Sequence, residues 1–203
     1  MNTIIIGIAG GTGSGKTSLA KGILSEYGEG EVAVIEQDSY YNDLSHILYE
    51  KRVTQNYDHP DSIDIELFES HLQNLLNGES VNVPTYNFAT HVRMDKTITI
   101  TPHHVIVVEG ILTLHYTQLR DLFAIKIFVD TPGRYSFYTT VNKGYERGRT
   151  ADSVNKQYLA TVRPMHDQFV EPSKYFADLI IPEGGENRVA VDLIRTKINS
   201  ILK

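Results

Sequence analysis

A glycine-rich run near the start of the chain has the residue types needed to hold a phosphate chain. Residues 10–17 read Gly-Gly-Thr-Gly-Ser-Gly-Lys-Thr and fit the pattern G-x-x-x-x-G-K-[ST]. The glycines allow the backbone to curl so that its N–H groups point inward at phosphate oxygens. An apolar run precedes the motif and a helical pattern follows it, so a helix dipole would add positive potential at the same place. This context favours a nucleoside triphosphate site over an ordinary glycine-rich turn.

The end of this motif predicts two separate chemical roles. We expect Lys16 to reach the β and γ phosphates and the Thr17 hydroxyl to ligate magnesium. The predicted ATP-binding set is the motif together with the serine that follows it: Gly10, Gly11, Thr12, Gly13, Ser14, Gly15, Lys16, Thr17 and Ser18.

Carboxylates that follow predicted strands are the second source of chemistry. Ligands of an open α/β sheet bind beyond the carboxyl ends of its strands, and Asp38, Glu109 and Asp130 occur at such ends. Phosphoryl transfer needs one acid to take the proton of the acceptor and another to hold magnesium. We assign Glu109 to the metal and Asp38 to the acceptor. Asp130 is predicted to have no such role, because a Pro-Gly pair at 132–133 turns the chain away.

The elements that would position these residues alternate along the chain. Apolar runs predict buried strands at 3–9, 32–36, 105–108, 125–129 and 179–181, and helical patterns cover 16–27, 63–76 and 189–202. This order predicts an α/β fold of the P-loop NTPase type, with a parallel sheet of about five strands flanked by helices in one domain, 1–203. Residues 81–101 alternate apolar and polar, which predicts an inserted antiparallel β-hairpin.

Composition excludes several classes of protein. The 203 residues include 19 basic and 25 acidic side chains, so the net charge of −6 argues against a nucleic-acid partner. No cysteine is present, which excludes disulfides and thiolate sites. The apolar runs are too short to span a membrane, and the start has no basic region or cleavage site of a signal peptide. We expect a soluble intracellular protein.

Several further motifs resemble the uridine (uridine–cytidine) kinase family of P-loop kinases. Besides the phosphate motif they are QDSYY at 37–41, NYDHP at 56–60, PTYNF at 84–88, HVR at 91–93, VVEGIL at 107–112, ERGR at 146–149, QY at 157–158, RPMH at 163–166 and ADLIIP at 177–182. Each motif alone is a weak pattern, but so many in the same order are specific. The resemblance covers most of the chain.

The resemblance implies transfer of the γ-phosphate of ATP or GTP to the 5′-hydroxyl of uridine or cytidine, a reaction of pyrimidine salvage. It implies Mg²⁺ as cofactor with Thr17 and Glu109 as metal residues, a cytoplasmic protein and a homotetramer. The catalytic set is then Asp38, as general base, with Lys16 and Arg147. The nucleoside-binding set is Tyr41, Asp58, Tyr86, Phe88, His91, Arg93, Arg149 and Gln157, with Asp58 on the ribose hydroxyls. The hairpin 81–101 would cover the nucleoside, and 131–150 would form a lid.

The lid segment is where the chain departs from this family, whose members carry an arginine-rich helix of the form D-x-R-L-x-R-R-x-x-R-D before ERGR. Counted back from residue 146, the arginine positions hold Tyr135, Tyr138, Thr139 and Asn142. Arginine clamps on a transferring phosphoryl group are worth roughly 10³ to 10⁵ in rate. An alternative function is therefore a nucleotide- and nucleoside-binding protein with weak or no kinase activity. A third reading, a P-loop kinase for another small acceptor such as pantothenate or phosphoribulose, would make the motif at 84–91 a coincidence.

Overall fold

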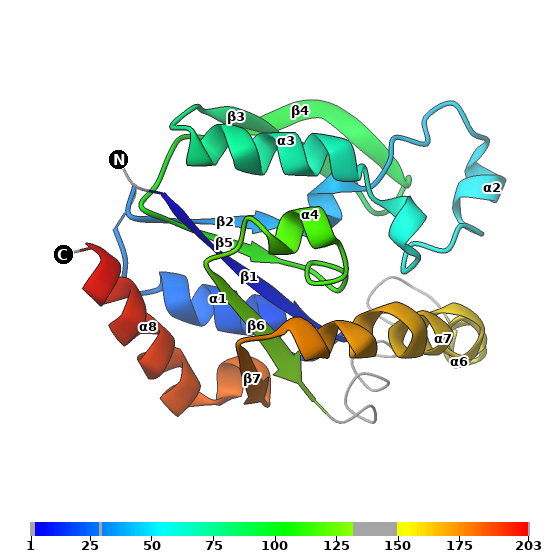
Figure 1. The fold of residues 1–203 in the computed structure, drawn as a ribbon. Coiled ribbons are helices and arrows are strands. Elements are labelled where there is room, and N and C mark those ends of the chain that lie inside the picture. The colour runs from blue at the N-terminus through cyan, green and yellow to red at the C-terminus, as the bar shows by residue number, and fades with distance from the viewer. Residues whose placement is uncertain (1–2, 29, 132–149, 203) are drawn as a thin grey trace.

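The fold is built on a parallel sheet whose strands come from apolar runs spread along the whole chain. The computed structural model describes residues 3–28, 30–131 and 150–202. The sheet consists of β1 (Ile4–Gly10), β2 (Val32–Glu36), β5 (Val105–Glu109), β6 (Ile125–Asp130) and β7 (Leu179–Pro182), in the order β2-β5-β1-β6-β7. Every neighbouring pair is parallel. The five predicted strands are thus confirmed, and β1 lies at the centre of the sheet (Figure 1).

Helices cover both faces of this sheet, so the architecture has three layers (Figure 1). On one face α1 (Lys16–Leu24) and α8 (Arg188–Leu202) contribute Leu19, Ile23 and Ile194 to a core that includes Ile6 and Ile8 of β1. Adjacent residues of β1 point to opposite faces because side chains alternate along a strand. Continuous apolar runs in the sequence therefore mark strands that are buried on both sides.

The opposite face is covered by α3 (Ile65–Leu76), by residues 111–123 and by the hairpin. Phe68, Leu72 and Leu75 lie three and four residues apart on α3, so they form one buried stripe. The Asp64 side chain accepts a hydrogen bond from the Leu67 backbone N–H and caps this helix. The helix therefore begins two residues later than the sequence pattern predicts.

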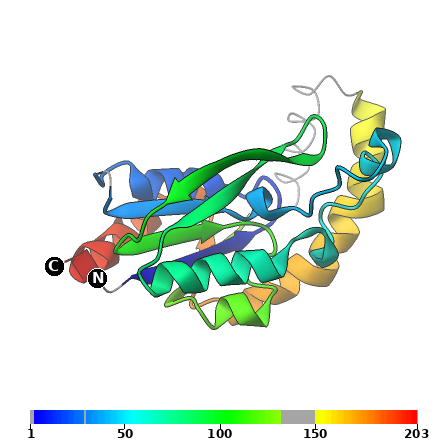
Figure 2. The same ribbon diagram turned by 90° about the horizontal axis from the view of Figure 1, so that it is seen from above.

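The predicted hairpin forms a separate two-stranded antiparallel sheet, β3 (Val81–Asn87) with β4 (Val92–Ile100). Pro84 lies beside an irregularity in the register between Pro84 and Thr85. Val81, Val83 and Tyr86 of β3 face the core, whereas most of β4 is exposed. Seen from above, the hairpin extends beyond the end of the sheet (Figure 2).

Shorter elements and one long irregular helical stretch complete the described chain. The short helices are α2 (Tyr49–Arg52) and α4 (Thr117–Arg120), and a 3₁₀ turn spans Gln37–Tyr40. From residue 151 onward, α6 (Ala151–Gln157) and α7 (Arg163–Met165) alternate with two π-helical stretches, Tyr158–Val162 and His166–Val170. The sequence patterns did not predict this stretch as a helix. No helix within the described residues is long and apolar enough to span a membrane.

Candidate functional site

The glycine-rich motif forms a loop between the central strand β1 and α1. Gly10, Gly13 and Gly15 have φ angles of 145°, 74° and 93°, in the region that favours glycine. A side chain at Gly10 would collide with the Val129 carbonyl, so the loop passes close to the end of β6. Gly15 sits directly before α1, so the loop ends at a helix N-terminus. This is the geometry that sequence context predicted for a phosphate-binding loop.

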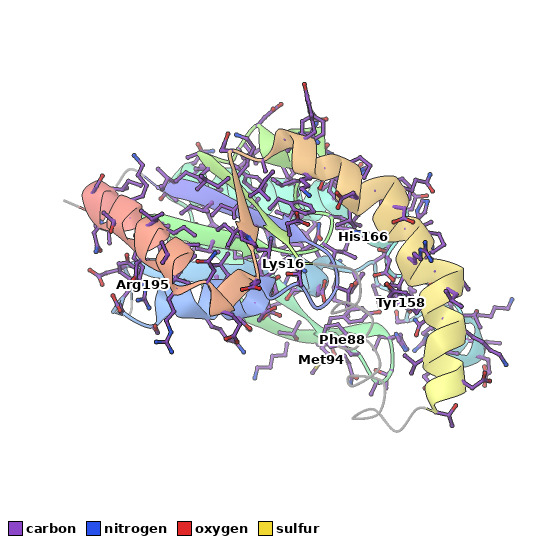
Figure 3. All side chains as sticks on the ribbon, turned by 90° about the horizontal axis from the view of Figure 1, so that it is seen from below. Lys16, Phe88, Met94, Tyr158, His166 and Arg195 are labelled. Carbon is purple, nitrogen blue, oxygen red and sulfur yellow. The ribbon has the colours of Figure 1, made fainter. Side chains whose placement is uncertain are left out.

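Lys16 is the one lysine of this loop, and it is buried at the start of α1. Its Nζ donates a hydrogen bond to the Gly11 carbonyl at 2.8 Å, and only 7% of the residue is exposed. Its positive charge lowers the pKa values of both Asp38 and Asp58. Lys16 therefore lies near both aspartates, and Figure 3 shows its position at the start of α1.

The two residues predicted to hold magnesium touch each other. The Thr17 hydroxyl donates a hydrogen bond of 2.7 Å to Glu109 Oε1, which joins the first turn of α1 to the end of β5. A hydroxyl and a carboxylate are hard oxygen ligands, which suit Mg²⁺. In residues 3–28, 30–131 and 150–202 no group of three or more acidic or histidine side chains could bind a metal. Two protein ligands fit Mg²⁺ that takes its other oxygens from phosphates and water.

Asp38 lies in the 3₁₀ turn just beyond β2, next to the strand that carries Glu109. Burial and, to a smaller extent, the negative charge of Glu109 raise the pKa of Asp38, Lys16 opposes both, and the pKa of Asp38 is about 6. Gln37 anchors this turn, because its Oε1 accepts a hydrogen bond of 2.9 Å from the Leu112 N–H. A carboxyl group with a pKa near 6 is ionised at neutral pH and can accept a proton.

Asp58 is the third acidic residue near Lys16. Tyr57, the residue before it, contacts His91 in the turn of the hairpin. Burial raises the pKa of Asp58, the charge of Lys16 opposes this rise, and the pKa of Asp58 is about 6. Its negative charge also raises the pKa of Asp38. The two aspartates therefore belong to one electrostatic cluster with the lysine.

Aromatic rings form a connected group between the Asp38 turn, the 56–60 segment and the hairpin. Tyr41 lies 5.2 Å from Tyr86 and 5.4 Å from Tyr57, measured between ring centroids. Tyr57 stacks on His91 at 4.9 Å, and Tyr86 meets Phe88 edge-on at 5.4 Å. Four of these five residues belong to the predicted nucleoside-binding set. Tyr57 was missed, although its neighbour Asp58 was predicted and an aromatic ring beside a predicted ligand was a usable signal.

The remaining predicted residues do not belong to the aromatic group. Arg93 contacts Asp64 and the Tyr41 carbonyl, while Gln157 is the partly exposed last residue of α6. Arg147 and Arg149 lie outside the described residues, as does the lid segment apart from its two end residues. Asp130, predicted to have no catalytic role, forms an ion pair of 2.7 Å with Lys174.

Two further contacts of the phosphate loop were not predicted. Gly184, in the turn after β7, has a φ of 56°, and a Cβ there would lie 2.6 Å from the Ser14 carbonyl oxygen. On the other side, the helical stretch that carries Tyr158 and His166 runs past the loop (Figure 3), and a Cβ on Gly11 would lie 3.1 Å from the His166 ring. The Gly184-Gly185 pair just after β7 was the sequence signal that could have predicted the contact between Gly184 and the phosphate loop.

Comparisons with known proteins show which family the chain is similar to. The profile of the Phosphoribulokinase / Uridine kinase family matches residues 5–190. A uridine kinase of Clostridium perfringens is 51% identical over 200 residues, which are 98% of this chain and 96% of that protein. A uridine kinase of Macrococcus caseolyticus is 51% identical over 202 residues, 99% and 98% of the two chains. The structure of phosphoribulokinase from Rhodobacter spheroides has a TM-score of 0.69 at 15% identity, over 89% of this chain and 70% of that one, a likeness of fold.

Proposed function

The chain belongs to the phosphoribulokinase/uridine kinase family, and from this premise we propose that it phosphorylates the 5′-hydroxyl of uridine or cytidine with ATP. The observation that carries the proposal is the position of Asp38, whose pKa is set by burial and by the charges of Glu109 and Lys16. A proton acceptor thus lies beside the residues that handle phosphate. The relatives that share half of its sequence are named as kinases, so they give no support to a binding protein without activity.

The reaction divides among the residues of the site. Backbone N–H groups of the phosphate loop bind the phosphates, and Lys16 balances their charge. The nucleoside O5′ attacks the γ-phosphorus as the bond to the bridging oxygen of ADP breaks, and Asp38 takes the hydroxyl proton. Mg²⁺, held by Thr17 and Glu109, would neutralise phosphate charge. The hydrogen bond between these two side chains supports that assignment.

The acceptor is held on the other side of Asp38. We assign Asp58 to the ribose hydroxyls, because one carboxylate can accept hydrogen bonds from two neighbouring hydroxyls. The rings of Tyr41, Tyr57, Tyr86 and Phe88 are assigned to the base, which they would pack against. His91 keeps its predicted role at the polar edge of the pyrimidine, with its ring held against Tyr57.

An assay of ADP release with uridine, cytidine and other small acceptors tests the proposal. We expect turnover on the two pyrimidine nucleosides with ATP and Mg²⁺. Turnover that favours another acceptor, or none while ATP still raises the melting temperature, would contradict it. The Lys16→Ala variant is the control, since it should lose ATP binding and turnover together.

Further parts of the proposal rest on family membership. We propose ATP or GTP as the phosphate donor, the cytoplasm as the location and a homotetramer as the assembly. Competition between ATP and GTP, cell fractionation and light scattering of the purified protein test these points separately.

A further inference from the structure

Arg93 lies on the hairpin, but its side chain contacts the body of the domain. In the β3–β4 register Arg93 is opposite Tyr86, one of the rings assigned to the nucleoside base. Its NH1 and NH2 groups donate hydrogen bonds of 3.1 and 3.2 Å to Asp64 Oδ2. NH2 also donates a hydrogen bond of 2.9 Å to the Tyr41 carbonyl. Only 20% of the arginine side chain is exposed.

Asp64 is held from a second direction. Its Oδ1 accepts the hydrogen bond of 3.1 Å from the Leu67 N–H that caps α3, so each carboxylate oxygen has a separate partner. The Asp64 backbone N–H donates to the Tyr40 carbonyl at 2.8 Å. These two hydrogen bonds hold Asp64 in place independently of Arg93.

The Tyr41 carbonyl completes a connection to the catalytic turn. Tyr41 directly follows the 3₁₀ turn Gln37–Tyr40 that carries Asp38, and a β-bridge pairs Tyr41 with Ile63. Tyr40, fully buried, stacks on Phe68 of α3 at 4.1 Å. One guanidinium thus joins three elements: the hairpin, the end of the catalytic turn and the start of α3.

The apolar side chains of β3 pack on the core, and the ion pair adds a directional connection to this packing. The hairpin shares no ladder with the main sheet, and a two-stranded sheet is marginally stable by itself. Charge-assisted hydrogen bonds to a fixed carboxylate are stronger and more directional than apolar contacts. We propose that Arg93 and Asp64 act together as positioning residues, which fix the base-covering hairpin relative to Asp38, and that Arg93 does not bind the nucleoside itself.

This inference rests on the proposed function, and uridine kinetics of three variants test it. Asp64→Asn keeps a capping oxygen for α3 but removes the charge that holds Arg93. Arg93→Met keeps an unbranched side chain of similar length. We expect each variant to raise the KM for uridine about tenfold, with ATP affinity within twofold of the wild type. The double variant should also show about a tenfold rise, because both substitutions break the same connection.

An ion pair far from the site supplies the matched control. Lys126 Nζ lies 3.2 Å from Asp178 Oδ2, and 24% of that lysine side chain is exposed. Lys126→Met should lower the melting temperature and leave the uridine KM unchanged. A uridine KM raised by Arg93→Met but within twofold of the wild type in Asp64→Asn would show direct binding by Arg93 and overturn the proposal. Effects that multiply to about a hundredfold in the double variant would also overturn it.

Hydrogen exchange separates failure of this inference from failure of the proposed function. In the protein without ligands, we expect amides of residues 81–100 to exchange about tenfold faster in Arg93→Met and in Asp64→Asn, with β1 and β5 unchanged. This measurement does not depend on turnover. Unchanged exchange in the hairpin would overturn the positioning role even if uridine is the substrate. Absence of uridine turnover in the wild type would instead contradict the proposed function.

Discussion

Replacement of Asp38 by asparagine should remove most of the turnover and stabilise the fold at the same time. Burial and the charge of Glu109 raise the pKa of Asp38 from 3.8 to about 6, so the ionised form is unfavourable in the folded protein. A shift of about two units corresponds to about 3 kcal/mol. The carboxyl keeps some solvent contact, so this value is an upper bound. For a domain of this size it corresponds to a rise in Tm of roughly 6 to 12 °C at most.

The size of this effect depends on pH, whereas its sign does not. Below pH 3.8 the carboxyl is protonated in both the folded and the unfolded chain, and it costs nothing. Between pH 3.8 and about 6 the folded state loses stability as pH rises, and above that range the cost is constant. The advantage of Asp38→Asn should therefore be complete at pH 8 and should shrink steadily as the pH falls toward 4.

The assay measures the melting temperatures of the wild type and of Asp38→Asn between pH 4 and 8, and their kinetics at pH 8. We expect kcat to fall by about 10² to 10⁴ because the general base is lost, while ATP affinity stays within about twofold. Asp130→Asn is the control, since it removes a carboxylate that Lys174 stabilises and should not raise Tm. An unchanged or lower Tm for Asp38→Asn at pH 8 would refute the reasoning about burial. Retention of most of the activity would refute the choice of base.

Three further predictions follow from the same site. The kcat/KM for uridine should rise at least tenfold per pH unit below pH 6 and level off above it, because Asp38 must be ionised and Asp58 ionises in the same range. A flat profile from pH 5 to 7 would contradict the role of Asp38. Gly184→Ala should weaken ATP binding, because its Cβ would lie 2.6 Å from the Ser14 carbonyl oxygen. Gly30→Ala is the control: Gly30 has a φ of 92° and open space around it, so this variant should lower only Tm. Equal ATP affinities of the two variants in titration calorimetry would refute this difference. Glu109→Gln keeps an acceptor for the Thr17 hydroxyl but removes the negative charge, so it should raise the Mg²⁺ concentration for half-maximal activity about tenfold. An unchanged Mg²⁺ requirement would contradict the assignment of Glu109 to the metal.

The parallel sheet was predictable because its strands are buried on both faces and therefore appear as continuous apolar runs. The phosphate loop was predictable because its glycine positions are dictated by backbone geometry, as the φ of 145° at Gly10 shows. The proximity of Asp38 and Glu109 followed from one topological rule, since both come at the carboxyl ends of strands that turned out to be neighbours.

The long helical stretch after residue 150 was not predictable from an α-helical period. Val154, Val162 and Val170 are all buried, although they are spaced eight residues apart. In a regular α-helix the first and the last of them would point to nearly opposite sides. The two π-helical stretches contain more residues per turn, which restores a common side. The Arg93–Asp64 contact was also beyond sequence reasoning, because it depends on how the hairpin packs, not on any spacing along the chain.

The separate hairpin has a consequence for how new acceptor preferences can arise. The phosphate loop, Asp38 and Glu109 lie on the central sheet and the turns that follow its strands. Tyr86 lies on β3, and Phe88 and His91 lie in the turn between β3 and β4, so all three belong to a hairpin that shares no ladder with the central sheet. Under the proposed function, mutations in residues 85–92 should therefore change which alcohol is accepted without disturbing the residues assigned to the phosphates. A hairpin exchanged between relatives would carry acceptor choice with it, provided that the partners of Arg93 are exchanged or retained as well. Under the proposed function the hairpin is a replaceable specificity module, and the ion pair between Arg93 and Asp64, close to the turn of the hairpin, sets the condition for replacing it.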